Sequence, residues 1–458
     1  MSEPGGTRSH LQGTVLIGVA GGMAAVAGGL LLAYFVLGPN GEAHAATPAQ
    51  PPPTVAAAPH GEPPPGLAGY LARPVELVTA HGSVTRTWGE LGARVDAEEA
   101  GGARGDLAAL AVRGSLPLRI DREQATKALL AIKASHDVSP SNAYLDLEER
   151  QVHADRAGQG LDVWASLPAL EAGARQGVAK LALVNVAVPA AVTQQTLGID
   201  DISTVMGHHL TKFPVTDRDR NFNLKLAASK LNGVVLKPGD ELSFNAQVGE
   251  RSEKEGYKIA HVITAGEMVD GLAGGTCQIS TTLFGAAFFA GLDIVKMTNH
   301  SRPSAYTPLG FDATVVWPNT DLKLKNPYEF PVVIHYRVAN GEALVEILGK
   351  PRPYDKVVFE RNILESSPFP TEERLDDTMP QDATSIDQAG FNGYKLERFR
   401  RFYKDGKLLK SNKWTVEYKP VTEYVRRGTS TDPEAKPPAD KPVARLQEPK
   451  GDKFSMTQ

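Results

Sequence analysis

The chain has 458 residues, of which 41% are hydrophobic and 22% are charged, a composition typical of globular proteins. This length is enough for two or three domains, each with a buried core of its own. The formal net charge is −4, and lysine and arginine are spread along the chain. Because nucleic-acid-binding proteins usually carry a clustered basic surface, these features exclude nucleic acid as an expected partner.

The first feature along the chain is an uncharged and mostly apolar run from Thr14 to Leu37. About twenty apolar residues are enough for a helix to cross a bilayer. Arg8 precedes the run and no lysine or arginine follows it before Arg73, so the positive-inside rule places the N-terminus in the cytoplasm and the bulk of the chain outside. We therefore predict a cytoplasmic tip and a transmembrane anchor in residues 1–38. The alternative is a cleaved signal peptide that ends at Ala43-His44-Ala45, although the apolar region of such peptides is usually shorter.

Composition then divides the part expected outside the membrane. Residues 39–66 are dominated by Ala, Pro and Gly and predict an extended linker. Residues 67–192 predict an α+β domain, with short strands and helices at Val75–Val78, Arg122–Ala134, Ala143–Asp146 and Pro168–Gln176. Pro168 is expected in the first turn of the last helix, where a missing N–H costs little.

Residues 200–350 predict a second α+β domain. A helix is expected over Phe222–Leu231, ended by Asn232-Gly233. Strands are expected at Val234–Leu236, Asp312–Trp317, Phe330–Val338 and, after a turn at Asn340-Gly341, Ala343–Leu348.

Residues 351–427 predict a β-rich extension, with a hairpin over Arg398–Leu409 that turns at Asp405-Gly406. Residues 428–458 are rich in Pro, Lys and Asp and predict a disordered tail. The expected fold class is therefore α+β, with an N-terminal transmembrane helix, two α+β domains and a β-rich C-terminal extension.

The only cysteine, Cys277, is the strongest candidate for chemistry. An unpaired thiol in an oxidising compartment is open to oxidation, so its presence in an exported chain needs a reason. Gly274-Gly275 permits a tight turn, Thr276 is the expected N-cap, and a helix is expected from Cys277 to Ala290, ended by Gly291. The start of a helix favours a thiolate, and its free N–H groups can receive an oxyanion. The alternative is an inert buried thiol, which also occurs at helix starts.

Two residues downstream favour the nucleophile. His300 follows a predicted strand, Leu292–Met297, that would run back past the helix. Asp312 begins a later strand and could hold the imidazole tautomer, which would complete a Cys–His–Asp arrangement with Cys277. Taken singly, His300 would be a solvated loop histidine and Asp312 a turn or capping carboxylate. Their combination with a lone exported cysteine predicts a catalytic triad.

Other candidate ligands are weaker. His208-His209 are adjacent, so on a strand their side chains point to opposite faces, and no carboxylate or cysteine stands at metal-ligand spacing. We therefore expect no metal and no other cofactor. Arg302 and Tyr306 are candidates for contacts with a carboxylate or a peptide, although a surface-loop role is equally compatible.

The second domain resembles a known family, the VanW-like proteins. The resemblance rests on motifs that occur in the same order in this chain, namely Asn221-Phe222-Asn223, Leu231-Asn232-Gly233, Lys237-Pro238-Gly239-Asp240-Glu241-Leu242-Ser243-Phe244-Asn245, Val248-Gly249, Gly256-Tyr257, Gly274-Gly275-Thr276-Cys277-Gln278-Ile279-Ser280-Thr281-Thr282-Leu283, His300-Ser301, Tyr306, Gly310-Phe311-Asp312-Ala313-Thr314, Asp321-Leu322 and Asn326. Two positions depart from the usual pattern, because Phe311 stands where the family often has Arg and Ala273 where it often has a third glycine.

Residues 67–192 carry a weaker resemblance to the peptidoglycan-binding domain that often precedes VanW domains, through Thr87–Leu91, Gly158–Asp162 and Val188-Pro189. Together with the predicted membrane anchor, the resemblances imply a membrane-anchored protein of the cell envelope. Its bulk would lie in the periplasm or extracytoplasmic space and act on peptidoglycan stem peptides.

Some members of the family are understood to act as L,D-transpeptidases through the cysteine that corresponds to Cys277, and the same site with water as acceptor would be a carboxypeptidase. The resemblance therefore implies catalysis by Cys277, His300 and Asp312, and substrate binding by Gly275, Thr276, Gln278, Ser301, Arg302 and Tyr306. The alternatives are a non-catalytic accessory protein linked to glycopeptide resistance and a thiol hydrolase that acts on a peptide outside the wall. No feature of the sequence predicts the oligomeric state.

Overall fold

A computed structural model describes residues 66–103, 106–264, 267–436 and 449–458. The predicted transmembrane anchor and almost all of the predicted linker lie outside these residues. The described part belongs to one compact unit, Glu62–Gln458. None of the helices described in it combines the length and the apolar character that crossing a bilayer requires.

The N-terminal part of this unit is a mixed α/β domain, as the sequence predicts. Its elements are α1 (Leu67–Leu71), β1 (Pro74–Thr79), β2 (Gly82–Thr87), β3 (Ala93–Val95), α2 (Ala97–Gly102), α3 (Leu107–Val112), β4 (Leu118–Ile120), α4 (Arg122–His136), β5 (Tyr144–Asp146), β6 (Gln151–His153), β7 (Gly158–Leu161), α5 (Val163–Gln176), β8 (Lys180–Ala182), β9 (Asn185–Val188) and α6 (Gln194–Leu197). Buried apolar side chains of β1, α4 and α5 form one core with Trp88.

Helix α5 begins earlier than predicted, so Pro168 lies inside it rather than in its first turn. The side chain of Asp162 accepts a hydrogen bond of 2.9 Å from the N–H of Ala165 and caps the helix at Val163. Leu167 and Leu170 are buried, so the face of α5 on which they lie packs against the core. The cap and this burial outweigh the single backbone hydrogen bond that the proline removes.

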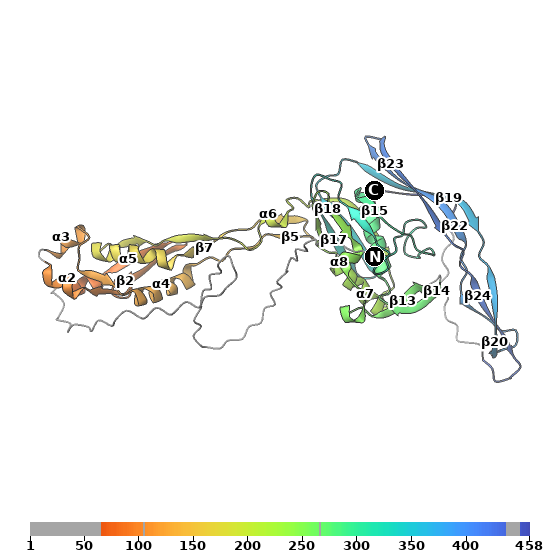
Figure 1. The fold of residues 1–458 in the computed structure, drawn as a ribbon, viewed down its shortest axis with the longest axis horizontal. Coiled ribbons are helices and arrows are strands. Elements are labelled where there is room, and N and C mark those ends of the chain that lie inside the picture. The colour runs from red at the N-terminus through yellow and green to blue at the C-terminus, as the bar shows by residue number, and fades with distance from the viewer. Residues whose placement is uncertain (1–65, 104–105, 265–266, 437–448) are drawn as a thin grey trace, which may run out of the picture. The chain divides into compact units, whose positions relative to one another are not determined.

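The second domain is built around one buried helix. Its elements are β10 (Thr204–Lys212), α7 (Arg218–Ser229), β11 (Val235–Leu236), β12 (Glu241–Ser243), α8 (Phe244–Val248), the 3₁₀ turn η1 (Glu253–Glu255), β13 (Ile259–Thr264), β14 (Glu267–Leu272), α9 (Thr276–Ala290), β15 (Asp293–Lys296), β16 (Lys323–Lys325), β17 (Val332–Ala339) and β18 (Glu342–Gly349). An antiparallel sheet in the order β10-β18-β17-β11 packs against α9. Its central strands β17 and β18 lie side by side (Figure 1). The predicted hairpin at Asn340-Gly341 joins β17 to β18.

Helix α9 is buried on all sides, and Cys277 is its only residue that is not buried. The sheet approaches the helix closely because β10 has Gly207 at the contact. A Cβ atom at Gly207 would lie 2.2 Å from the backbone nitrogen of Ala290, which is closer than atoms can pack. The helix is therefore held in the core by close packing, and Cys277 in its first turn is the residue that reaches the surface.

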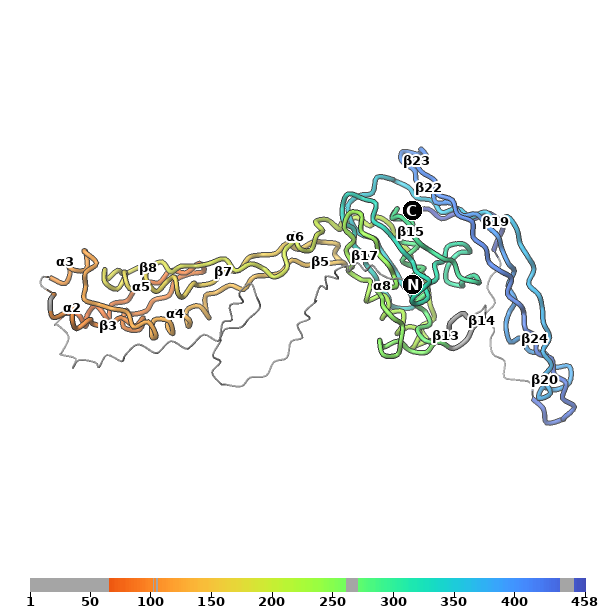
Figure 2. The backbone as a smooth tube through the Cα atoms, in the orientation of Figure 1, coloured from red at the N-terminus to blue at the C-terminus, as the bar shows by residue number. Residues whose placement is uncertain are grey.

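The β-rich extension continues directly from the second domain. Its strands are β19 (Lys356–Ser367), β20 (Thr371–Pro380), β21 (Thr384–Gln388), β22 (Gly393–Lys404), β23 (Lys407–Tyr418), β24 (Glu423–Ser430) and β25 (Lys453–Thr457). β19 and β22 pair along their whole length and run side by side (Figure 2). β22 and β23 form the predicted hairpin around Asp405-Gly406.

The predicted disorder of residues 428–458 is wrong for two described segments of this tail. β24 continues to Ser430, and β25 pairs antiparallel with β19 from Lys453 to Thr457. Composition misses this pairing because an edge strand gains its hydrogen bonds from a distant partner and needs few apolar side chains.

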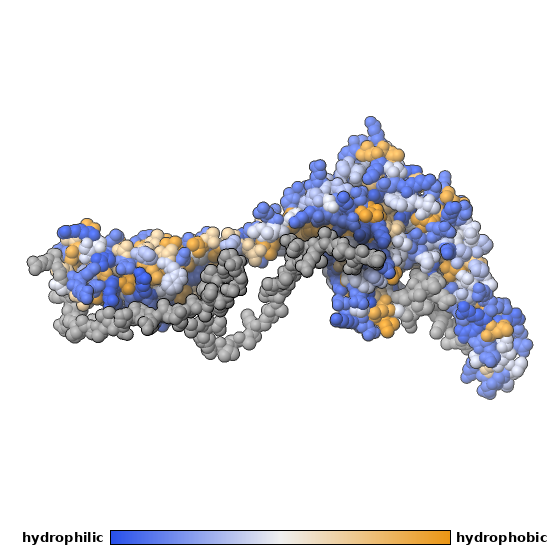
Figure 3. All heavy atoms as spheres, viewed as in Figure 1, coloured by the Kyte–Doolittle hydropathy of each residue, from blue (hydrophilic) through white to orange (hydrophobic). Residues whose placement is uncertain are grey.

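The extension shares its core with the second domain. Phe359 of β19 and Phe402 of β22 belong to the same buried cluster as Phe284 and Phe288 of α9. On the face of this part of the molecule that Figure 3 shows, the described residues are mainly hydrophilic and apolar side chains lie in scattered groups. The extension is therefore packed onto the second domain and covers α9.

Candidate active site

Cys277 lies in the first turn of α9, as predicted, but the cap of this helix differs from the prediction. Gly275, rather than Thr276, is the N-cap, with a left-handed φ of 104°. The hydroxyl of Thr276 instead donates a 2.7 Å hydrogen bond to the carbonyl of Ala273. Ala273 also has a positive φ, 62°, which gives a physical reason why a glycine suits this position.

The N-terminal turn leaves one backbone donor available beside the thiol. The N–H groups of Thr276 and Gln278 donate to the carbonyls of Ala273 and Gly275. Within the described part of the chain, no backbone acceptor is recorded for the N–H of Cys277. This N–H can therefore serve an oxyanion that develops next to the sulfur.

His300 and Asp312 form a closed, buried pair. His300 follows β15, which confirms the predicted strand before it, and only 6% of it is exposed; for Asp312 the exposed fraction is 1%. One carboxylate oxygen, Oδ2, accepts from the backbone N–H of His300 at 2.6 Å and lies 2.8 Å from its Nδ1. These two bonds fix the ring and place the proton on Nδ1, which leaves Nε2 for the thiol.

The segment after Asp312 is not the strand that the sequence predicts. It lies along α9, where the side chains of Ser280 and Thr281 donate to the carbonyl of Ala313 and the hydroxyl of Thr281 accepts from its N–H. Helix side chains thus occupy the groups that a neighbouring strand would have bound. This arrangement brings Thr314 to the sulfur, with 3.3 Å between Thr314 Oγ1 and Cys277 Sγ.

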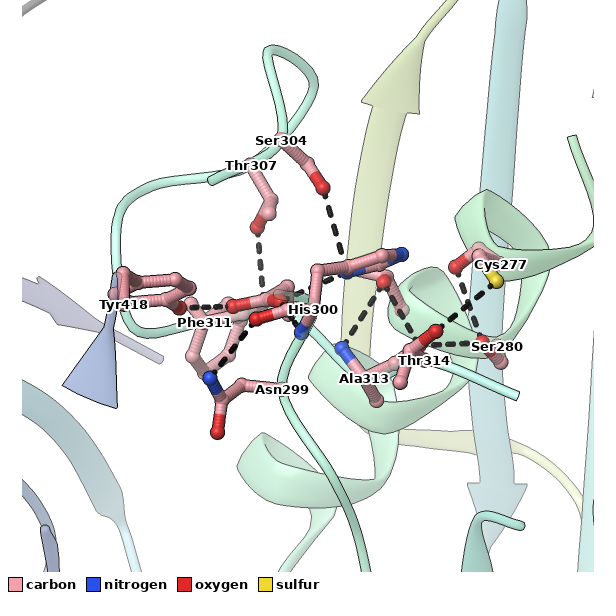
Figure 4. A network of polar contacts seen from close by, with 12 residues as sticks. Cys277, Ser280, Asn299, His300, Ser304, Thr307, Phe311, Ala313, Thr314 and Tyr418 are labelled. Carbon is pink, nitrogen blue, oxygen red and sulfur yellow. Dashed lines mark hydrogen bonds and ion pairs between the residues drawn. The ribbon is translucent and has the colours of Figure 1, made fainter. Parts of the chain in front are cut away.

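Nδ1 of His300 is bound to the carboxylate of Asp312, and the far nitrogen of the His300 ring points to the side of the Cys277 sulfur (Figure 4). Cys277 is partly exposed. Burial raises the pKa of its thiol. The hydrogen bond and charge of His300, together with the hydrogen bond of Thr314, lower the pKa by more than burial raises it, so the thiol pKa is about 7.

The charges of the pair agree with this. Burial lowers the pKa of His300, while Tyr306, the Asp312 carboxylate and Cys277 raise it, and it stands well above its usual range. Burial raises the pKa of Asp312, but hydrogen bonds from His300 and Tyr418 hold it below its usual value. At neutral pH the site therefore favours a thiolate, an imidazolium and a carboxylate in a row.

The predicted substrate-binding residues fall into two groups, those whose side chains make internal hydrogen bonds and those in the loop after His300. Gln278 is buried, and its amide donates to Thr211 and Lys212 and accepts from Arg220. These bonds hold β10 and α7 to the start of α9 and leave no donor of the amide for a ligand. Thr276, with its hydroxyl bound to the backbone, has a similar internal role.

The three predicted binding residues in the loop after His300 differ in exposure. Ser301 is exposed, Arg302 is buried, and the ring of Tyr306 lies edge-on to His300 with 6.5 Å between the ring centres. Burial raises the pKa of the Tyr306 hydroxyl. Tyr306 is thus a predicted binding residue whose ring lies against the catalytic histidine.

Two arginines and a tyrosine near the site have no signal in the sequence. Arg220 and Arg251 lie close enough to Cys277 for a thiolate there to stabilise their charged forms, although burial lowers the pKa of each. Tyr418, on β23, donates to Asp312. All three come from segments far from Cys277 in the chain, so no local pattern joins them to it.

The adjacent histidines do not form a metal site. His208 is exposed, whereas the ring of His209 packs edge-on against Phe311 at 5.2 Å, and burial lowers its pKa to about 4. Phe311 itself is fully buried among the aromatic side chains of α9, which suits the phenylalanine at this position. Among the residues that the structure describes, no cluster of three or more His, Cys, Asp or Glu side chains could hold a metal ion.

Two family models match separate parts of the chain. Residues 219–348 match a family model described as VanW like protein, and residues 360–430 match the G5 domain. The chain is 37% identical over 142 residues to the uncharacterized protein YoaR of Bacillus subtilis (strain 168), which covers 31% of this chain and 47% of YoaR. It is 28% identical over 152 residues to the vancomycin B-type resistance protein VanW of Enterococcus faecalis (strain ATCC 700802 / V583), covering 32% and 55%. The chain thus spans about half the length of these curated relatives.

Two solved G5 domains are each similar to a part of this chain. The IgA1 protease G5 domain is 17% identical and covers 17% of this chain and 98% of its own, with a TM-score of 0.12. The G5 domain of HP0197 is 20% identical and covers 16% and 97%, with a TM-score of 0.10. The two family models identify residues 219–348 as a VanW-like domain and residues 360–430 as a G5 domain.

Proposed function

We propose that this protein is a cysteine acyl-transferase of the cell wall, of the L,D-transpeptidase type, that acts on peptidoglycan stem peptides. The observation that carries the proposal is the row of Cys277, His300 and Asp312, in which the thiol pKa is lowered to about 7 and its main activator is His300. A buried thiol with no catalytic role has no need of an ionised partner.

The acyl-transfer chemistry follows from these positions. The Cys277 thiolate attacks the carbonyl carbon of the third residue of a donor stem peptide, and the carbonyl oxygen takes the negative charge next to the N–H of Cys277. As the tetrahedral intermediate collapses, the bond to the terminal D-residue breaks. The imidazolium of His300 gives its proton to the departing amine, which leaves a thioester and a neutral imidazole.

The second half runs in the opposite direction. A side-chain amine of a neighbouring stem attacks the thioester, and neutral His300 takes the proton that this amine loses. The new amide is the cross-link, and the thiolate and imidazolium are restored. With water in place of the amine, the same steps would give a carboxypeptidase.

The parts outside the active site fit a role at the wall. We propose that residues 67–192 and the G5 domain hold the protein on peptidoglycan, and that residues 1–38 attach it to the membrane with its bulk outside. The printed description of the E. faecalis relative as a vancomycin resistance protein supports a place in the cell envelope.

The test is to incubate the purified full chain, in detergent, with disaccharide tetrapeptides from peptidoglycan and to follow products by mass spectrometry. We expect an acyl adduct on Cys277 that has lost the terminal D-residue, and cross-linked dimers, both absent from Cys277→Ala. His208→Ala is the matched control, because His208 is an exposed histidine on β10. A tripeptide product without dimers would reassign the enzyme as a carboxypeptidase, and the lack of any adduct would leave a non-catalytic binding protein.

A further inference from the structure

One contact to the triad comes from outside the VanW-like domain. Cys277, His300 and Asp312 all lie within residues 219–348, the range of the VanW-like match. Tyr418 lies at the end of β23, within residues 360–430, the range of the G5 match. Its hydroxyl donates to Oδ1 of Asp312.

The two oxygens of Asp312 have separate partners. Oδ2 accepts both bonds from His300, and in the described part of the chain Oδ1 accepts only from Tyr418. The tyrosine oxygen in turn accepts a 3.1 Å bond from the N–H of Gly310, two residues before Asp312. Tyr418 is 2% exposed, so water does not replace its hydroxyl.

Other residues of the same hairpin hold the two ends of the histidine–aspartate loop. Arg398 of β22 donates to the carbonyl of Gly310 at 3.0 Å, and its guanidinium lies over the rings of Phe284 and Trp414 at 5.2 and 5.1 Å. The side chain of Asn299 donates to the backbone carbonyl of Glu417 at 3.1 Å. The segment between Asn299 and Asp312 is thus attached to the β22–β23 hairpin at both ends.

We infer that Tyr418 of the G5 domain is a positioning residue for the catalytic pair, and that the active site of this protein is complete only with the β22–β23 hairpin in place. The inference rests on the proposed function, because it assigns Tyr418 a role in activating the Cys277 thiol. The G5 domain would then have two tasks, attachment to the wall and support of the triad.

The role of Tyr418 follows from the charge of the cluster. When the Cys277 thiol ionises beside the imidazolium and carboxylate, the cluster changes from neutral to a net charge of −1. A hydrogen bond donated to Asp312 stabilises the more negative state. Removal of the Tyr418 hydroxyl should therefore raise the pH at which Cys277 ionises. The other ionisable groups that face Asp312 are His300, Tyr306 and Arg398, and the substitution leaves them all in place.

The alternative is that Tyr418 only fills the core and that its hydroxyl bonds to the nearest acceptor, as buried tyrosines usually do. Both roles predict a loss of stability when the hydroxyl is removed. Only the positioning role predicts a change in the ionisation of Cys277.

The experiment measures the rate of alkylation of Cys277 by iodoacetamide, as a function of pH, in the full chain. For Tyr418→Phe we expect the midpoint of the profile to move up by about half a unit or more. Tyr328→Phe is the matched control, because Tyr328 is a buried tyrosine whose hydroxyl donates a 2.6 Å bond to the carbonyl of Ala290, at the far end of α9. Its midpoint should stay at the wild-type value.

Two further variants separate a direct effect from unfolding. In an Asp312→Asn background, Tyr418→Phe should shift the midpoint little, because the charge through which Tyr418 acts is gone. A fluorinated tyrosine in place of Tyr418, a stronger donor of nearly the same shape, should move the midpoint down. This variant keeps the test valid if Tyr418→Phe does not fold.

The outcomes distinguish this inference from the proposed function. A wild-type midpoint at the value of an ordinary free cysteine would remove the activated thiol and with it the proposed function. A wild-type midpoint near 7, unchanged in folded Tyr418→Phe and in the fluorinated protein, would overturn the role of Tyr418 alone. Full additivity of Tyr418→Phe and Asp312→Asn would overturn it as well.

Discussion

Replacement of His300 by alanine tests how the Cys277 thiol is activated. Burial alone raises the pKa of this thiol, and the hydrogen bond and charge of His300 are the main effects that lower it to about 7. At pH 7 about half of such a thiol is ionised, compared with about 1% of a thiol at the reference pKa of 9.0. We therefore expect His300→Ala to slow the alkylation of Cys277 at pH 7 by about 50-fold, which corresponds to about 2.3 kcal/mol.

The assay is the rate of iodoacetamide addition to the full chain between about pH 5 and pH 10, with Cys277 followed by mass spectrometry. The wild-type profile should have its midpoint near 7. The His300→Ala midpoint should lie at 9 or above, because the effect of burial persists when the histidine is lost. His208→Ala, an exposed position on β10, should match the wild type. A His300→Ala midpoint that stayed near 7 would refute the reasoning, since another group would then have to activate the thiol.

Three further predictions follow from the surroundings of the site. Gly275→Ala should lower the unfolding free energy by about 1–3 kcal/mol, seen as a lower melting temperature, because φ is 104° there; Gly69→Ala, in a helix with no heavy atom within 4 Å of the new Cβ, should not destabilise. Phe288→Ala should cost about 3–5 kcal/mol in urea unfolding, because its ring is fully buried among aromatic neighbours. The same change at Phe222, which is 43% exposed, should cost far less. Arg220→Gln should move the alkylation midpoint of the thiol upward, because the Arg220 guanidinium and the Cys277 thiolate stabilise each other's charge and the variant lacks the positive charge. Arg220→Lys keeps a positive charge and should retain most of the wild-type value.

The β22–β23 hairpin explains why the VanW-like domain is followed directly by the β-rich extension in this chain. The VanW-like domain supplies the thiol, the imidazole and the carboxylate, but the carboxylate has one oxygen whose donor comes from the next domain. Phe359 and Phe402 join the core around α9, so the two domains bury apolar surface against each other. This shared core makes the β22–β23 hairpin a fixed part of the site rather than a freely moving appendage.

The local elements and the three central residues can be predicted from the amino-acid sequence. Glycine at positions 275 and 291 marks the two ends of α9, and Asp405-Gly406 marks a hairpin turn, because these residues act on their immediate neighbours. Cys277 was identifiable because it is the only cysteine and stands at a helix start. His300 and Asp312 were identifiable because a short strand and a loop return the chain to that helix.

The hydrogen-bond partners of these residues depend on long-range contacts that form only in the folded chain. Asp312 was expected to begin a strand, but side chains of α9 take the backbone bonds of the next residue, Ala313, and the segment lies along the helix. β25 was expected to be disordered, but β19 supplies its hydrogen bonds. Tyr418 meets Asp312 across 106 positions of the chain. A hydrogen bond between such distant residues leaves no periodic pattern in either segment. It forms only in the folded chain, because buried polar groups there must find a donor or acceptor, and Tyr418 and the carboxylate of Asp312 satisfy each other.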